Sequence, residues 1–137
     1  MDPRELHVRD MMTTDVVTVG RNDTLKDAEE RLGERRIRHL VVLNEDGHPC
    51  GVLSQRDLFR GVLLRALGYG GRTEERMLKS ALVKEAIHVK LITTTAEATA
   101  AQAAELLVEN QIGCLPVVEG DRLVGIISES DFVRLAL

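Results

Sequence analysis

The segment TLKDAEERLGERRIRHLVV at residues 24–42 recurs in altered form as TAAQAAELLVENQIGCLPV at residues 99–117. The alignment extends without a gap from residues 8–43 to residues 83–118, and every match lies 75 positions further along the chain. Self-similarity at a fixed spacing is typical of a duplicated structural unit. After a turn that is one residue shorter in the second copy, the spacing becomes 74. Identical pairs include Val8/Val83, Thr18/Thr93, Thr24/Thr99, Ala28/Ala103, Leu32/Leu107, Ile37/Ile112, Leu40/Leu115, Gly51/Gly125, Ser54/Ser128 and Asp57/Asp131.

Each copy predicts the order strand, helix, strand, strand, helix (β-α-β-β-α), which is a mixed α/β unit. A threonine precedes each first helix and has Asp or Gln three residues later, the pattern of a capping box. Apolar residues at helical spacing follow on one face, and β-rich runs joined by polar turns predict a hairpin after each helix. The predicted strands are residues 15–19, 38–43 and 50–53 in the first copy and 90–94, 114–118 and 123–127 in the second, and the closing helices start at Gln55 and Glu129.

One unit of this size has too small an interior to be stable alone. We therefore expect the two copies to pack sheet to sheet about a pseudo-two-fold axis and to form one α/β (α+β) module. The predicted boundaries are residues 1–67 for the first copy, 68–80 for a connector and 81–137 for the second copy.

The composition favours a cytoplasmic binding protein over several other classes. Apolar residues make up 44% of the chain and no apolar run is long enough to span a bilayer, so we expect a folded domain and no membrane partner. A net charge of −4 and 2% aromatic residues disfavour nucleic acid, which requires a basic face or aromatic stacking. Cys50 and Cys114 lie outside any C-x-x-C spacing and the histidines are scattered, so no metal site is predicted.

Two matching segments hold the residues that we single out for binding, Gly51-Val-Leu-Ser-Gln-Arg-Asp57 and Gly125-Ile-Ile-Ser-Glu-Ser-Asp131. In each, Ser-x-x-Asp follows a glycine and two apolar residues and opens a helix. A capping box alone explains Ser-x-x-Asp, at about 1 kcal/mol of helix stability. Three features favour binding: capping boxes usually carry the longer Glu or Gln, glycine lets another group approach a strand, and a hydroxyl with a carboxylate at a helix start suits phosphate and ribose. Both interpretations stay open at this stage.

With these segments, the chain resembles a tandem pair of CBS domains, a Bateman module, from about Val8 to Arg134. The resemblance implies clefts between the copies that bind an adenosine-containing ligand. AMP is the first candidate, with ADP, ATP or S-adenosylmethionine as alternatives, and no cofactor is obligatory. The resemblance further implies that Asp57 and Asp131 hold ribose hydroxyls, that Ser54 and Ser128 contact phosphate, that Thr18 and Thr93 seat adenine, and that Arg38, His39, Gly113 and Cys114 line the central cleft.

The two clefts are predicted to differ in charge. Arg56, with the strand start Arg38-His39 nearby, can neutralise a phosphate at the first motif, whereas Glu129-Ser130 occupies the matching place in the second. We therefore expect tighter phosphate binding at the Asp57 cleft. The alternative for Arg56 is a solvated side chain at a helix start. The alternative for His39 is a strand residue whose hydrogen bonds are made within the protein and not with a ligand.

We expect no catalytic activity, because the sequence contains no nucleophile–base set, no P-loop and no G-x-G-x-x-G motif. The first hypothesis is a sensor whose copies shift their packing when an adenosyl ligand binds, which alters a partner protein or the oligomer. The second is a structural dimerisation or interaction module with empty clefts. A homodimer is expected, and the apolar residues of the closing helices form either its interface or part of the core: Leu58, Phe59, Val62 and Leu63, with Phe132, Val133 and Leu135.

Overall fold

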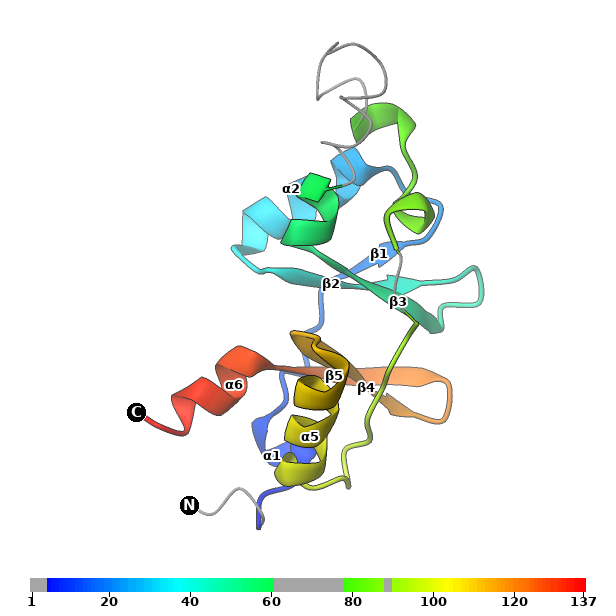
Figure 1. The fold of residues 1–137 in the computed structure, drawn as a ribbon. Helices are drawn as coiled ribbons and strands as arrows, with labels where there is room; N and C mark the ends of the chain where they lie inside the picture. Colours follow the sequence, from blue (N-terminus) through cyan, green and yellow to red (C-terminus); the bar gives the residue numbers. More distant parts are fainter. Residues whose placement is uncertain (1–4, 61–77, 88–89) are drawn as a thin grey trace. The chain divides into compact units, whose positions relative to one another are not determined.

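A computed structural model describes residues 5–60, 78–87 and 90–137 of the chain (Figure 1). Its contacts divide the chain into two compact units, Val17–Leu91 and a second that joins Met1–Val16 to Ile92–Leu137. We call them the first-copy unit and the second-copy unit, after the repeat that supplies most of each. Both units combine a small sheet with helices, so the predicted mixed α/β fold is confirmed. Within the described residues, no helix is both long and apolar enough to cross a bilayer.

The first-copy unit contains a three-stranded sheet in the order β1-β2-β3. β1 (Thr18–Gly20) pairs in parallel with β2 (His39–Leu43), and β2 pairs antiparallel with β3 (Pro49–Ser54). The predicted hairpin is therefore confirmed, and its turn uses Gly47 at a left-handed φ of 79°, which glycine adopts without a steric penalty. A helix begins directly after β3, at residue 55, and is described through residue 60.

The helix α2 (Leu25–Arg35) begins with the capping box that the sequence predicts. Thr24 Oγ1 accepts the backbone N–H of Asp27 at 3.2 Å, and Asp27 Oδ2 accepts the backbone N–H of Thr24 at 3.1 Å. These two bonds satisfy backbone donors that a helix start leaves without partners. The residues of α2 that are buried in the core of this unit are Leu25, Ala28 and Leu32.

Among the described residues, the second-copy unit has fewer strands than its counterpart. It contains α5 (Ala100–Asn110), β4 (Cys114–Glu119), β5 (Arg122–Ser128) and α6 (Glu129–Arg134), and its two strands form an antiparallel hairpin. The strand predicted at residues 90–94 is wrong, because this segment makes only a single parallel bridge, between Thr94 and Val117. Its β-branched residues favour extended backbone, but a strand also needs a neighbour that pairs along its length.

Each copy places its N-terminal segment in the other copy's unit. α1 (Val8–Met11) belongs to the second-copy unit, where Thr13 and Ile126 exchange two backbone hydrogen bonds of 2.9 Å. The short 3-10 helix η1 (Val83–Ala86) belongs to the first-copy unit, where Val83 N–H donates to the carbonyl oxygen of Asp23 at 2.8 Å.

This exchange gives the compact units different N-terminal boundaries from the predicted copies at residues 1–67 and 81–137. A sequence repeat shows that two segments are alike, but it does not show which copy each segment packs against. Residues 68–77 of the predicted connector lie outside the described residues. Packing of the copies about a pseudo-two-fold axis stays a prediction.

Candidate ligand-binding site

The first Ser-x-x-Asp segment forms a reciprocal capping box where β3 ends and the next helix begins. Ser54 N–H donates to Asp57 Oδ2 at 3.1 Å, and Asp57 N–H donates to Ser54 Oγ at 3.0 Å. Both side chains therefore turn back onto the start of their own helix. Asp57 is half-buried there, and the next position toward the N-terminus is the exposed Arg56.

The second segment makes a related but different arrangement. Ser128 N–H donates to Asp131 Oδ2 at 2.8 Å, and the Ser128 hydroxyl lies 3.3 Å from the same oxygen. The other carboxylate oxygen, Asp131 Oδ1, accepts a bond from Arg134 Nη1 at 3.1 Å. The Asp131 side chain is only 8% exposed. Both oxygens of Asp131 thus have partners within α6 and its cap.

One argument for binding that the sequence offers is wrong. The sequence suggested that the third position of a capping box usually carries the longer Glu or Gln, and that Asp in both motifs therefore favours a ligand. Asp27 closes the box of α2 at 3.1 Å, and Asp10 accepts the backbone N–H of His7 at 2.9 Å in the same way before α1. Aspartate at this position is therefore the chain's ordinary way of capping a helix.

The glycine of each motif is likewise explained by packing within its own unit. A Cβ at Gly51 would lie 3.0 Å from Ile87 Cδ1, and a Cβ at Gly125 would lie 2.7 Å from Met12 Sδ. The group that approaches the strand is thus a side chain from the exchanged N-terminal segments, and the two covering residues occupy matching positions of the repeat. The inference that a ligand approaches at these glycines is corrected accordingly.

The structure does bring each motif next to the strand start that the sequence assigns to the same cleft. In the first-copy unit, His39 lies opposite Ser54 across the hairpin, and Gln55 N–H donates to the carbonyl oxygen of Arg38 at 2.8 Å. In the second-copy unit, the same roles fall to four other residues: Cys114 lies opposite Ser128, and Glu129 N–H donates to Gly113 O at 3.0 Å. These residues are therefore neighbours within each unit, and their place along a ligand cleft stays a prediction.

The electrostatic contrast between the two copies also has a counterpart in the structure. Burial raises the pKa of the Cys114 thiol to about 12, and the Glu129 carboxylate adds to the rise. The second copy thus has a neutral buried thiol at the position of His39, a glycine at the position of Arg38 and a carboxylate at the position of Gln55. Among the described residues, no group of three or more metal-ligating side chains gathers.

The two predicted adenine contacts, Thr18 and Thr93, differ in the strand pairing of their backbones. Thr18 is the first residue of β1 and is paired with Val41 of β2. β1 and β3 flank β2 in one sheet, so Thr18 and the Ser54 motif lie on opposite sides of the same central strand. Thr93 is half-buried and precedes the single bridge at Thr94.

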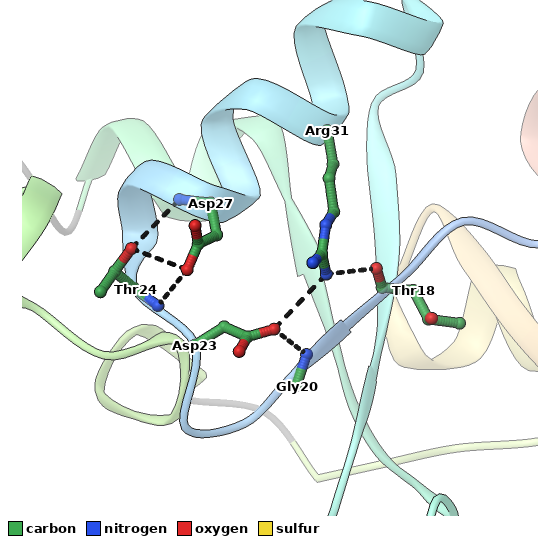
Figure 2. A network of polar contacts seen from close by, with 6 residues as sticks. All are labelled: Thr18, Gly20, Asp23, Thr24, Asp27 and Arg31. Atoms are coloured by element: carbon green, nitrogen blue, oxygen red, sulfur yellow. Dashed lines mark hydrogen bonds and ion pairs between the residues drawn. The ribbon is translucent and has the colours of Figure 1, made fainter.

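Sequence reasoning missed a polar network beside Thr18 (Figure 2). Arg31 Nη1 donates to the carbonyl oxygen of Thr18 at 2.9 Å and lies 3.4 Å from Asp23 Oδ2. The same oxygen of Asp23 accepts the backbone N–H of Gly20 at 2.7 Å. A comparison of the copies could have found this network, because the matching positions 98 and 106 carry alanine and leucine.

The family model of the CBS domain matches residues 8–64 and again residues 83–137. An uncharacterized protein from Methanocaldococcus jannaschii, MJ1404, is 29% identical over 136 residues, which are 96% of this chain and 32% of that protein. The chain thus spans about a third of the length of this relative.

Solved structures share the whole fold. The CBS-domain containing protein ATU1752 from Agrobacterium tumefaciens superposes with a TM-score of 0.78 at 28% identity, over 96% of this chain and 93% of that one. The CBS domain pair of protein MJ0100, crystallised in complex with 5′-methylthioadenosine and S-adenosyl-L-methionine, has a TM-score of 0.72 at 24% identity, over 95% and 94% of the two chains. At this identity the likeness to MJ0100 concerns the fold alone.

Proposed function

Because the chain belongs to the CBS domain family and carries two CBS domains in tandem, we propose that it binds an adenosine-containing ligand and so regulates a partner protein or its own assembly. A CBS pair is a regulatory module, and the proposal concerns the ligand, for which AMP is the first candidate. The MJ0100 pair supports this choice of ligand class, since a chain of the same fold was crystallised with two adenosyl compounds.

The observation that carries the proposal is the repeated placement of a Ser-x-x-Asp helix start beside the first residues of a neighbouring strand. Ser54 lies opposite His39, and Ser128 lies opposite Cys114. A hydroxyl and a carboxylate therefore come together at the same end of each hairpin. Such a pair of groups suits the hydroxyls and the phosphate of a nucleotide.

In this proposal each aspartate keeps its capping bond through Oδ2 and offers Oδ1 to a ribose hydroxyl. Asp131 Oδ1 already accepts a bond from Arg134, so a ligand there must share or displace this mostly exposed side chain. We therefore expect tighter binding at Asp57, where Arg56 adds positive charge. The other proposed contacts are Ser54 and Ser128 with phosphate, Thr18 and Thr93 with adenine, and Arg38, His39, Gly113 and Cys114 along the cleft.

Isothermal titration calorimetry with AMP, ADP, ATP and S-adenosylmethionine tests the proposal. We expect at least one ligand to bind, and Asp57→Ala to weaken its binding about tenfold, because a charged hydrogen-bond partner is lost. The substitution also removes one of the two capping-box bonds, the one from Ser54 N–H to Asp57 Oδ2 at 3.1 Å, at a cost of about 1 kcal/mol. The matched control is Gln102→Ala, which removes the equivalent bond of α5, from Thr99 N–H to Gln102 Oε1 at 2.9 Å. The control should lose stability and keep its affinity.

Two outcomes contradict the proposal. One is the absence of binding heat with all four ligands at protein concentrations that reveal micromolar affinity. The other is an equal affinity of the wild type and Asp57→Ala, which would leave the carboxylate with capping as its role. Thermal denaturation is an independent check, because ligand at 100 times its Kd should stabilise the folded protein by about 2.7 kcal/mol.

Exposed apolar side chains favour self-association as a second function. Phe59 and Val133 occupy matching positions of the two closing helices, and each is 63% exposed. Neither is therefore explained by the core of its own unit. Two other predicted interface residues, Leu58 and Phe132, pack on the cores of their own units, so the proposed interface does not include them. Val62 and Leu63 lie outside the described residues.

We accordingly propose a homodimer that uses the closing helices. Sedimentation equilibrium of Val133→Glu tests this proposal, because a charge in an apolar interface opposes association. The control is Leu137→Glu, which places the same charge on a residue that is 97% exposed at the end of the chain. Dimer formation by both variants at wild-type strength would contradict the proposed interface.

A further inference from the structure

The turn between β1 and α2 is held by three polar contacts that converge on Asp23 and Arg31 (Figure 2). Asp23 Oδ2 accepts the backbone N–H of Gly20 at 2.7 Å and closes the turn. Arg31, two turns into α2, reaches back to the same oxygen at 3.4 Å and to the carbonyl oxygen of Thr18 at 2.9 Å. One guanidinium group thus ties the helix to the first residue of the strand.

The position of β1 explains what this contact does. β1 is an edge strand, since the sheet order is β1-β2-β3. An edge strand presents backbone carbonyl groups that have no neighbouring strand. Arg31 supplies the donor for one such carbonyl, at Thr18, and its side chain is 42% exposed, so the contact lies at the surface of the unit.

The second copy lacks the side chains that form this Asp23–Arg31 network. The positions that match Asp23 and Arg31 carry Ala98 and Leu106, and both of these side chains pack against the apolar core of the second-copy unit. The pairing register is nevertheless the same, because Val19 lies opposite Val42 and Thr94 lies opposite Val117.

The extent of pairing differs between the copies as the network does. Where the network is present, β1 pairs over three residues, Thr18–Gly20. Where it is absent, pairing shrinks to a single bridge at Thr94. The segment with the proposed adenine contact Thr18 is therefore held by more backbone pairing than the matching segment with Thr93.

We propose that Arg31 is a positioning residue for the ligand site, and that it holds the Thr18 backbone in its binding conformation before the ligand arrives. This inference rests on the proposed function. A site that is already ordered avoids the loss of conformational freedom that an unfastened segment undergoes on binding. The site that uses Thr18 is then preformed, whereas the Thr93 segment orders when its ligand binds.

The test replaces Arg31 by the residue of the second copy, Arg31→Leu. The control is Lys26→Leu, which removes the same charge from the same helix; Lys26 is half-buried and pairs with Glu29 at 3.5 Å, away from β1. Titration calorimetry with AMP measures affinity, and amide hydrogen exchange of residues 18–20 reports the order of β1. We expect Arg31→Leu to weaken AMP binding about tenfold and to speed exchange at β1, and Lys26→Leu to change neither. Arg31→Lys, with one donor group in place of the fork, should fall between them.

Each outcome decides one question. If exchange at β1 becomes faster while AMP affinity stays at the wild-type value, Arg31 stabilises the strand only and the inference is overturned. An equal loss of affinity in Lys26→Leu would assign the effect to net charge and would also overturn it. Failure of the proposed function is seen separately, as wild-type protein that binds none of the four adenosyl ligands.

Discussion

Replacement of Gly125 by alanine is the perturbation for which the structure gives the sharpest expectation. A Cβ at this position would lie 2.7 Å from Met12 Sδ and 3.1 Å from the carbonyl oxygen of Thr13. The thioether can rotate away, because methionine is unbranched and flexible. The carbonyl belongs to the backbone and accepts the N–H of Ile126 at 2.9 Å, so it moves only if that bond lengthens.

The magnitude follows from two opposing effects. Forcing an extra methyl group into a filled site costs about 1–3 kcal/mol. Removing a glycine from a strand restores about 0.5–1 kcal/mol, because the unfolded chain loses freedom. The two effects combine to about 0–2.5 kcal/mol of destabilisation, and we expect about 1–2 kcal/mol because the Thr13 carbonyl is held by its backbone bond. For a domain of this size, such a change lowers the melting temperature by about 4–8 °C.

Urea and thermal denaturation of Gly125→Ala, Met12→Ala and the double variant measure the contact itself. Met12→Ala removes the sulfur atom, so the double variant should be more stable than the sum of the single changes by about 1 kcal/mol. Gly51→Ala is the matched control, because its Cβ would meet only side-chain atoms of Ile87, at 3.0 and 3.1 Å, and should cost less. Strictly additive energies, or a Gly125→Ala protein as stable as the wild type, would refute the packing of the exchanged segment over β5.

Two further predictions follow from single sites. A Cβ at Gly33 in α2 would meet nothing within 4 Å, so Gly33→Ala should stabilise the protein by about 1 kcal/mol in thermal denaturation, and a loss of stability would contradict the geometry of the helix. The pKa of the Cys114 thiol is raised from 9.0 to about 12, so the folded state retains a proton that the unfolded state releases. The resulting stability is fully present below pH 9 and is lost toward pH 12, by about 1.4 kcal/mol per pH unit, and Cys114→Ala should show a flatter decline in urea denaturation between pH 9 and 10.5.

The sequence predicted those elements whose signals are local. Thr24 and Thr99 mark the starts of α2 and α5, and both capping boxes form as expected. The two hairpins were equally predictable, since turn residues and alternating apolar residues lie next to each other in the chain. The strand at residues 90–94 was not, because a strand depends on pairing with a distant segment, and this one makes a single bridge, between Thr94 and Val117.

The exchange of N-terminal segments could not be predicted for a different reason. Met12 and Ile87 occupy matching positions of the repeat, and either could have covered Gly51 or Gly125 on the basis of sequence alone. Only long-range contacts decide between packing within a copy and packing across copies. The same ambiguity made the glycines look like places of ligand approach, although apolar side chains of the chain fill them.

The duplication gives each copy the role of a control for the other. A feature that both copies share is one that the common fold can require: the glycines admit Met12 and Ile87, and the Ser-x-x-Asp pairs cap helices. Residues that differ at matched positions are not required by the fold, because the other copy folds without them. At the positions of the second copy that match Arg31, Arg38 and Arg56, the sequence has Leu106, Gly113 and Ser130. The function that is specific to the first copy should therefore be sought at these three arginines.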